Sequence, residues 1–317
     1  MSNISLLHNR KTAIIGSGFV GASIAYALTI RNLAREIVLI DKDEKRAIGE
    51  ALDIQHGISS MGVSSVRAGD YSDCENCDLI IITAGRNRKV GESRLDLIND
   101  NVKTLEEVVS SMKPYYNRGA ILMVANPVDI LTYKCSELMG LPDGRVFGTG
   151  TVLDSSRLIR VVADYIGLNT EVVKGNIVGE HGDGQVTIWS KFSIGGVPVD
   201  EFCEDFDLEW DDEVKLEMER KVRGLGAEII SDKGKTHYGI ATCVCLIADA
   251  ILNQRLTIVP VTSILRGEYG IDGVSLSVPS IIGANGVERR LEERWSEEEY
   301  AKFKASALKM KEVASKL

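Results

Sequence analysis

Short apolar runs alternate with amphipathic stretches along the first half of the chain. The runs are rich in Ile, Val and Leu, and the stretches between them carry apolar residues at helical spacing. This alternation is typical of a parallel sheet whose strands are buried on both faces by helices. The predicted strands cover 11–15, 36–40, 65–68, 78–83 and 120–124, and the predicted helices cover 22–30, 43–59 and 97–112.

The pattern changes near Gly148-Thr149-Gly150, where strict alternation gives way to a long amphipathic helix. Mixed short strands and further helices follow. We therefore predict an α/β fold, with a doubly wound parallel sheet in residues 1–148 and a mixed α+β substrate domain in residues 149–317. The later elements are expected as helices at 152–166, 211–231, 236–252 and 296–315, and as strands at 256–264 and 274–282.

A glycine-rich turn joins the first predicted strand to the first helix. Its sequence is Gly16-Ser17-Gly18-Phe19-Val20-Gly21, and the order strand, turn and helix is the context of a Rossmann-type dinucleotide site. Gly16 permits the tight turn, Gly18 lets the backbone approach a pyrophosphate, and Gly21 lets the helix pack closely on the strand. The N-terminus of that helix attracts the negative phosphates.

Asp41 ends the second predicted strand, about 20 residues beyond the glycine turn, where Rossmann-type sites carry an acid. A carboxylate at this place accepts hydrogen bonds from a ribose diol and repels a 2′-phosphate. We therefore predict NAD, and not NADP, as the cofactor. A doubly wound fold without a nucleotide is the alternative.

Segments that follow predicted strands deserve most weight, because ligands bind at the carboxyl ends of the strands in such sheets. Asn126 stands at one predicted strand end, ahead of a rigid turn at Pro127. Asp154 and Arg157 lie three apart on one helix face, where the alternative is a plain intrahelical ion pair. The loop from Arg86 to Arg94 concentrates positive charge, and the alternative there is a solvated charge run.

His181 lies between glycines in Gly179-Glu180-His181-Gly182-Asp183, directly after the apolar pair Ile177-Val178. Glycines on both sides permit backbone turns that present the imidazole at a strand end. Imidazole titrates near neutrality and is suited to general acid–base catalysis. The alternative is an ordinary histidine in a turn.

Composition narrows the class of protein. The chain has 317 residues, 44% of them hydrophobic, and a net charge of −9, values typical of a globular protein with one or two domains. No long uncharged apolar run is present and residues 1–10 lack a signal-peptide core, so we predict a cytoplasmic protein without a membrane partner. Because the sequence contains no block of lysine and arginine, we predict that nucleic acid is not a binding partner.

The cysteines match no zinc-binding spacing, and the single Cys74-Glu75-Asn76-Cys77 pair has no second pair to answer it. We predict no metal site and structural thiols in a reducing compartment. The cysteines are Cys74, Cys77, Cys135, Cys203, Cys243 and Cys245.

Taken together, the motifs resemble those of the NAD-dependent L-lactate and malate dehydrogenases, and are closest in appearance to the bacterial L-lactate dehydrogenases. The resemblance covers essentially the whole chain. It rests on the glycine turn, Asp41, Thr83-Ala84-Gly85, Gly91–Leu97, Asn126-Pro127-Val128-Asp129, Leu153–Arg157 and Gly179–Asp183.

The resemblance implies an enzyme of glycolysis and fermentation that transfers a hydride between NADH and a 2-oxo acid. His181 would exchange the proton, Asp154 would hold its second ring nitrogen, and Arg94 on a closing loop would polarise the carbonyl. Arg157 would bind the substrate carboxylate, and Asn126 would orient the carbonyl and the nicotinamide. The implied cofactor-binding residues are Gly16, Gly18, Phe19, Val20, Gly21, Asp41, Arg46, Tyr71, Gly85, Asn126 and Thr149.

Two features of the substrate pocket conflict. In this family the residue six before the loop arginine recognises the far end of the substrate, and here it is Arg88. An arginine facing the methyl group of pyruvate would be an unpaired buried charge, at a cost of about 3–5 kcal/mol, which favours oxaloacetate. Its long side chain can instead turn to solvent. Gly91–Leu97, Trp189-Ser190 and Thr236, which narrows the pocket, resemble the lactate branch.

We therefore predict an L-lactate dehydrogenase, with malate dehydrogenase or another L-2-hydroxy acid dehydrogenase as the alternative. A catalytically inactive NAD-binding protein is an alternative of a different class, which the joint presence of the implied catalytic residues disfavours. The resemblance also implies a homo-oligomer, a dimer or a tetramer. Ile159 and Lys174 stand where many bacterial members have an arginine and a histidine that bind fructose 1,6-bisphosphate, so weak or absent activation is implied.

Overall fold

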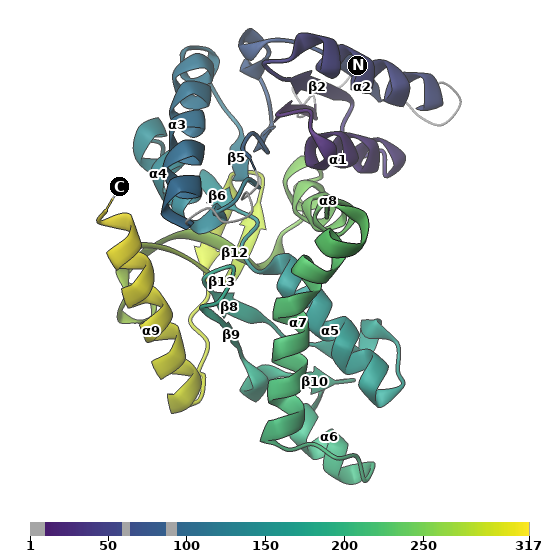
Figure 1. Ribbon diagram of the computed structural model, residues 1–317, viewed down its shortest axis with the longest axis vertical. Coiled ribbons are helices and arrows are strands. Elements are labelled where there is room, and N and C mark those ends of the chain that lie inside the picture. Colours follow the sequence, from purple (N-terminus) through teal and green to yellow (C-terminus); the bar gives the residue numbers. More distant parts are fainter. Residues whose placement is uncertain (1–9, 59–63, 87–93, 317) are drawn as a thin grey trace, which may run out of the picture.

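The structure is a computed structural model that describes residues 10–58, 64–86 and 94–316. Parallel strands from the first half of the chain form one end of its main sheet (Figure 1). Their order, β3-β2-β1-β4-β5-β6, is that of a Rossmann-type doubly wound sheet. These strands are β1 (Lys11–Ile15), β2 (Glu36–Ile40), β3 (Ser65–Ala68), β4 (Leu79–Ile82), β5 (Ala120–Met123) and β6 (Val146–Gly148).

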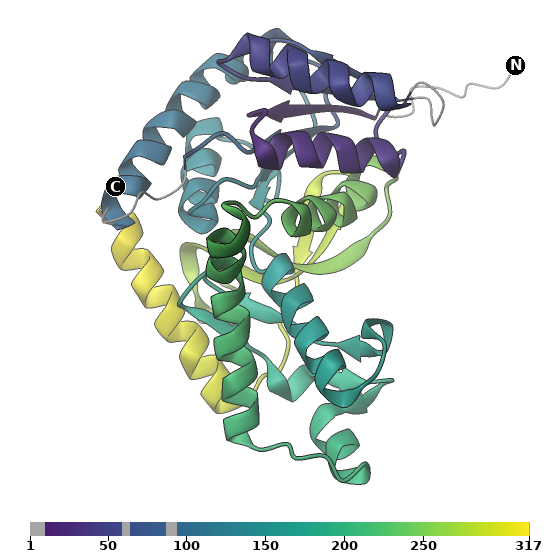
Figure 2. The same cartoon turned by 45° about the vertical axis from the view of Figure 1, so that its right-hand side comes forward.

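Helices cover both faces of these strands, because successive strand residues point to opposite faces. On one face Ile14 shares a core with α1 (Phe19–Ile30), α2 (Glu44–Ile58) and α8 (Tyr238–Leu252). On the other face Ile15 shares a core with α3 (Arg94–Met112), α4 (Val128–Met139) and α9 (Glu297–Ala314). Figure 2 shows α1 running beside α8, a helix from the second half of the chain. The predicted doubly wound arrangement is confirmed.

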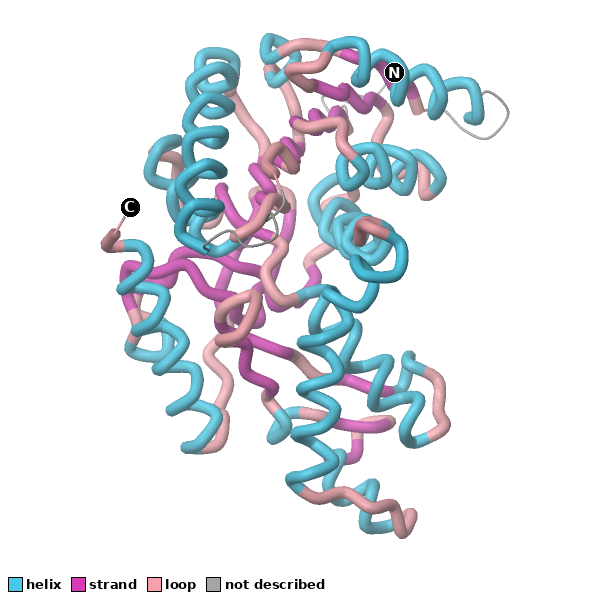
Figure 3. Tube along the Cα trace, in the orientation of Figure 1, coloured by secondary structure: helices cyan, strands magenta, loops and turns pink. Residues whose placement is uncertain are grey.

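The second half extends the same sheet with antiparallel strands. β12 (Thr257–Arg266) pairs with β6 through Thr262 and Gly148, and then with the long strand β13 (Asp272–Gly283). β13 in turn pairs with β8 (Ile177–Gly179) and β14 (Gly286–Arg290), and β8 pairs with β9 (Gln185–Thr187). Strands therefore run through the middle of the molecule with helices on either side (Figure 3). The mixed character predicted for the second half is confirmed.

A smaller core lies away from the main sheet, at the lower end of the view in Figure 1. There α5 (Val152–Ile166), α6 (Val199–Asp205) and α7 (Asp212–Lys233) pack on a small antiparallel sheet of β7 (Val173–Lys174), β10 (Ser193–Ile194) and β11 (Val197–Pro198). Phe192 and Leu158 are fully buried in this core. The short 3-10 helices are η1 (Tyr71–Cys74), η2 (Lys113–Tyr115), η3 (Thr170–Val172), η4 (Trp189–Lys191) and η5 (Glu268–Gly270).

The sequence did not predict α4 or α6. The segment from Asn126 to Pro127 was interpreted as a turn alone, yet α4 begins directly after it, with Pro127 as its N-cap. Val128, Leu131 and Cys135 are buried at helical spacing, which is the signal that the turn interpretation overlooked.

None of the helices in the described ranges is long and apolar enough to span a bilayer. The cysteines, which all lie in those ranges, are free and buried, and burial raises the pKa of Cys74 and of Cys77 to about 12. Their thiols therefore stay protonated at neutral pH and pack as small apolar groups.

Candidate active site

His181, Asp154 and Arg157 form a hydrogen-bonded group at the end of β8. The Nδ1 atom of His181 lies 2.6 Å from Oδ2 of Asp154, and Nη1 of Arg157 lies 3.3 Å from the other oxygen, Oδ1. The Asp154 side chain is 5% exposed, whereas that of His181 is 27% exposed. A buried carboxylate thus holds one ring nitrogen, and among the described residues none forms a hydrogen bond with the other, Nε2. Asp154 therefore forms both the intrahelical ion pair with Arg157 and the predicted contact with His181, each through a different carboxylate oxygen.

Hydroxyl groups at the start of α5 fix this helix to β8. The main-chain N–H of Ile177 donates to Oγ of Ser155 at 2.8 Å, and the Thr151 hydroxyl donates to the Ile177 carbonyl at 2.5 Å. These contacts set the height of Asp154, one residue before Ser155, against the strand that leads to His181. Gly179 and Gly182 then turn the chain at φ values of +87° and +144°, which side-chain-bearing residues rarely adopt.

Opposing effects set the charges of this group. Burial disfavours the imidazolium of His181, but the charge and hydrogen bond of Asp154, together with the charge of Asp129, outweigh it and raise the pKa of His181 above its usual value. Burial likewise raises the pKa of Asp154, but His181 and Arg157 outweigh it and the net pKa is lowered. The geometry therefore favours a charged imidazolium beside a charged carboxylate.

The guanidinium of Arg157 lies between Asp154 and helix α7. Gly226 of α7 lies next to it, because a Cβ atom at that position would be in ordinary van der Waals contact with Nη2 of Arg157, at 3.8 Å. The Arg157 side chain is 15% exposed. A planar, half-enclosed guanidinium beside His181 is suited to bind a carboxylate through two parallel hydrogen bonds.

The glycine turn after β1 is closely packed behind and open in front. A Cβ at Gly16, whose φ is +102°, would lie 2.7 Å from Oγ1 of Thr83, and one at Gly21 would lie 1.9 Å from the Gly16 carbonyl oxygen. By contrast a Cβ at Gly18 would meet nothing within 4 Å. Gly18 is the N-cap of α1 and has no side chain that could accept a hydrogen bond from the first N–H groups of the helix. The N-terminus of α1 is therefore accessible to an anion.

Asp41 lies directly after β2 and is bound to the same turn. Its Oδ2 accepts hydrogen bonds from the main-chain N–H of Ser17 at 2.6 Å and from the Ser17 hydroxyl at 3.0 Å. Burial acts to raise the pKa of Asp41, but the N–H groups of Asp43 and Ser17 outweigh it and the net pKa is lowered. Arg46 donates from Nε to the Ser17 carbonyl at 3.1 Å and lies 5.9 Å from the ring centre of Phe19.

These residues fit NAD. The close contacts behind Gly16 and Gly21, the open face at Gly18 and the ionised Asp41 supply a surface for a pyrophosphate and an acceptor for ribose hydroxyls. The further predicted cofactor-binding residues lie at the carboxyl ends of neighbouring strands. Val20 follows in the first turn of α1, Tyr71 begins η1 after β3, Gly85 follows β4, Asn126 follows β5 and Thr149 follows β6.

Asn101 of α3 connects two of these strand ends, although no sequence motif selects it. It is 1% exposed, donates to the Asn126 carbonyl at 2.7 Å, and accepts from the main-chain N–H of Arg86 at 2.9 Å. Arg86 in turn pairs with Asp100 at 2.7 Å. A polar residue inside a helix carries no local signal of such a role, because its partners come from distant loops.

Asp129 is the second functional candidate that the sequence did not predict. It belongs to the motif Asn126-Pro127-Val128-Asp129, but the motif assigned it no role. It lies 2% exposed in the first turn of α4 and accepts the main-chain N–H of His181 at 2.8 Å. A buried acid in a helix that had not been predicted could not be placed against His181 from spacing alone.

The predicted loop arginines lie in or next to the range 87–93, which is outside the described residues. Arg88 lies outside the described residues, and only the backbone of Arg94, the first residue of α3, lies within them. Thr236 lies half-buried in the link between α7 and α8. The structure thus brings together His181, Asp154 and Arg157.

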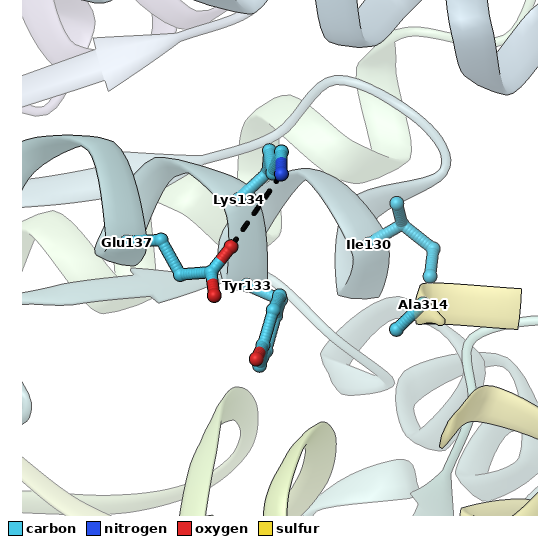
Figure 4. A pocket seen from close by; sticks show the side chains of 5 residues that line it. All are labelled: Ile130, Tyr133, Lys134, Glu137 and Ala314. Carbon is cyan, nitrogen blue, oxygen red and sulfur yellow. Dashed lines mark ion pairs between the residues drawn. The ribbon is translucent and has the colours of Figure 1, made fainter. Parts of the chain in front are cut away.

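Two cavities adjoin α4. The first, of about 90 Å³, borders the site and is lined by Pro127, Asp129, Glu180 and His181 on one side and by Lys309 of α9 on the other. The second, of about 160 Å³, lies on the outer face of α4 beside the end of α9 (Figure 4). Its polar lining consists of Tyr133 and the ion pair of Lys134 with Glu137, 3.6 Å apart, and none of its lining residues belongs to the site.

Known families and structures match nearly the whole chain. The family models that match are the NAD binding domain of lactate/malate dehydrogenase, over residues 10–148, and the alpha/beta C-terminal domain of lactate/malate dehydrogenase, over residues 151–317. An L-lactate dehydrogenase of Thermoanaerobacterium saccharolyticum is 43% identical over 307 residues, 97% of this chain and 99% of the relative.

An L-lactate dehydrogenase of Lactococcus lactis subsp. cremoris is also 43% identical, over 96% of this chain and 97% of the relative. Among solved structures, the minor L-lactate dehydrogenase of Enterococcus mundtii in its ligands-bound form superposes with a TM-score of 0.94. It is 38% identical and the match covers 98% of this chain and 99% of that chain.

Proposed function

This chain belongs to the lactate/malate dehydrogenase family, and we propose that His181, Asp154 and Arg157 carry out its reaction, the reversible reduction of pyruvate by NADH. The observation that carries the proposal is the contact of His181 Nδ1 with the buried Asp154, with Arg157 on the other oxygen of the same carboxylate. This arrangement places a proton donor beside a carboxylate-binding cation.

The chain is an NAD-dependent L-lactate dehydrogenase. Relatives of that name match at least 96% of the chain, which confirms the predicted activity and cofactor and the predicted enzyme class. The alternative of an inactive NAD-binding protein is therefore set aside. Malate dehydrogenase, the alternative raised by Arg88, is not favoured by these relatives.

When bound, NADH supplies a hydride to C2 of the 2-oxo acid. The residues of this chain supply the proton and the orientation. His181 donates its Nε2 proton to the carbonyl oxygen, while Asp154 keeps the Nδ1–H in place and stabilises the charged ring before transfer. In the direction of lactate oxidation the neutral ring accepts the hydroxyl proton at the same atom.

Arg157 binds the carboxylate of the substrate through its planar fork and so fixes C2 relative to His181. Asp154 holds the guanidinium from one side and α7 encloses it from the other. We propose in addition that Arg94 polarises the carbonyl, that Asn126 orients it, and that Thr236 and Arg88 border the far end of the substrate.

We further propose that residues 1–148 bind the cofactor and residues 149–317 supply most of the substrate site. Catalysis at Asp154 and His181 then depends on contacts across that boundary, such as the pairing of β6 with β12. The proposal extends to a cytoplasmic homo-oligomer, a dimer or a tetramer, with weak or no activation by fructose 1,6-bisphosphate.

The substrate is tested by kcat/KM with NADH for pyruvate and for oxaloacetate on one enzyme preparation, because this ratio reports differential binding of the transition states. We expect pyruvate to be the better substrate by at least about tenfold, which corresponds to about 1.4 kcal/mol. A clear preference for oxaloacetate would mean that Arg88 binds a second carboxylate in the pocket.

We expect Asp41→Asn to relax the cofactor preference. Loss of the negative charge removes repulsion of a 2′-phosphate, and charges about 4 Å apart near a protein surface interact by about 1–4 kcal/mol. The ratio of kcat/KM for NADPH to that for NADH should therefore rise by about tenfold or more. Asp53→Asn, an exposed position on α2, is the control and should leave the ratio unchanged. An unaltered ratio in Asp41→Asn would exclude a role of Asp41 in cofactor choice.

A further inference from the structure

His181 is held by carboxylates at two points. Asp154 of α5 accepts from the ring, and Oδ2 of Asp129, in the first turn of α4, accepts from the main-chain N–H at 2.8 Å. The proposed mechanism uses the first contact only. Asp129 is 2% exposed. Burial of a charged carboxylate is unfavourable unless hydrogen bonds or nearby charges compensate for the lost solvation.

The other oxygen of Asp129 faces buried hydroxyl groups of the antiparallel strands. Thr262 of β12 donates its hydroxyl proton to Oδ1 of Asp129. Thr262 Oγ1 lies 2.7 Å from Oγ of Ser277 on β13. The Ser277 Oγ accepts a hydrogen bond from the main-chain N–H of Thr151 at 3.1 Å. Because Thr262 uses its own proton for Asp129, Ser277 must donate to Thr262. Each hydrogen bond in this series therefore donates in the direction of Asp129, an arrangement that stabilises a negative charge on its carboxylate.

The charges around Asp129 come from several elements. Burial raises the pKa of Asp129 to about 6, although Thr262 and His181 act to lower it. The charge of Glu180, which precedes His181, also acts to raise the pKa of Asp129. Nζ of Lys309 on α9 lies 3.4 Å from Oε2 of Glu180. Asp129 is therefore ionised at neutral and alkaline pH, where its charge favours the protonated form of His181.

We propose that Asp129 is a positioning residue that fixes His181 through its main chain and supplies a second negative charge that keeps the imidazole protonated for 2-oxo acid reduction. The inference rests on the proposed role of His181 as the proton donor. Asp129 thereby connects His181, in the second half of the chain, to α4 of the first half. Through Thr262 and Ser277, Asp129 is also connected to the antiparallel strands β12 and β13.

Asp129→Asn isolates the charge. The amide carbonyl still accepts the N–H of His181, and the amide nitrogen donates to Thr262, whose hydroxyl can turn and donate to Ser277. We expect the pKa of His181, measured by NMR titration of histidine-labelled protein, to fall by roughly one unit, as for loss of a nearby opposite charge. The chain has four histidines, and His181→Asn assigns the resonance.

Ser280→Ala is the matched control, because it removes a buried hydroxyl of the same strand β13 that donates to the Val278 carbonyl and leaves both carboxylates, Thr262 and Ser277 in place. It should leave the pKa of His181 unchanged. Thr262→Val is a second variant that keeps the carboxylate but removes its donor, so Asp129 takes up a proton at higher pH and the pKa of His181 falls by less. An unchanged pKa in both Asp129→Asn and Thr262→Val would overturn the proposal.

The pH profile of kcat/KM for pyruvate gives a second readout. The profile is high below the pKa of His181 and falls above it, because the protonated ring is needed. In Asp129→Asn the fall should begin roughly one unit lower, a loss of about tenfold at alkaline pH. Below about pH 6, where the wild-type Asp129 is itself protonated, the two profiles should converge. An equal loss at every pH would indicate a merely structural contact and overturn the proposal.

The two readouts separate this inference from the proposed function. If His181 is not the proton donor, the wild-type rate profile will not follow the NMR titration of His181, whatever Asp129 does. If His181 is the donor but Asp129 has no influence, the rate profile will follow the titration and neither will move in Asp129→Asn.

Discussion

Replacing His181 by Asn is expected to lower kcat/KM for pyruvate by about 10³-fold, within the range typical of a lost general acid. Asparagine is polar and of similar reach, but it cannot carry a proton near neutral pH. Binding of NADH, measured by fluorescence titration, should change little, because the substitution leaves the proposed cofactor-binding residues, Asp41 and the glycine turn, in place. The rate is measured as loss of NADH absorbance with pyruvate as the second substrate.

His56→Asn, an exposed position on α2, is the control and should keep wild-type activity. A variant of His181 that retains more than about a tenth of the wild-type kcat/KM would contradict the assignment, since general acids contribute about 10²-fold or more. The two directions of the wild-type reaction supply a further check. Pyruvate reduction should fall as pH rises through the raised pKa of His181, and lactate oxidation should rise over the same interval.

Arg157→Lys is expected to lower kcat/KM for pyruvate by about 10- to 100-fold, mainly through KM. A lysine cannot offer two parallel hydrogen bonds to a carboxylate, and a lost hydrogen bond to a charged group costs about 1.5–3 kcal/mol. The change keeps the positive charge beside Asp154, so the protonation of His181 and the fold should be little affected. The measurement is the steady-state dependence of rate on pyruvate concentration.

Arg160→Lys is the matched control on the same helix. Arg160 is 69% exposed and pairs with Asp164 at 2.8 Å, so its replacement should leave both kcat and KM unchanged. If Arg157→Lys keeps a wild-type KM for pyruvate, the guanidinium only supports Asp154 and some other cation binds the substrate carboxylate.

The sequence by itself determined the features that depend on neighbours along the chain. Buried runs such as Lys11–Ile15 and Glu36–Ile40 predicted the parallel strands, because their apolar content and length are local properties. The glycine turn and Asp41 predicted the cofactor for the same reason, since strand, turn, helix and acid follow each other in fixed order. The residue types also selected His181, Asp154 and Arg157, although spacing could not show that they meet.

Only the tertiary structure decided which residues meet. Asp154 and His181 are 27 positions apart, and their contact depends on how hydroxyl groups of α5 hold β8. Asp129 gained a role because α4 brings it under the main chain of His181. Thr262 and Ser277 carry no signal in the sequence, because a buried hydroxyl acquires a function only from the register of the strands that carry it. Register and helix docking are long-range properties, which a pattern of neighbouring residues does not contain.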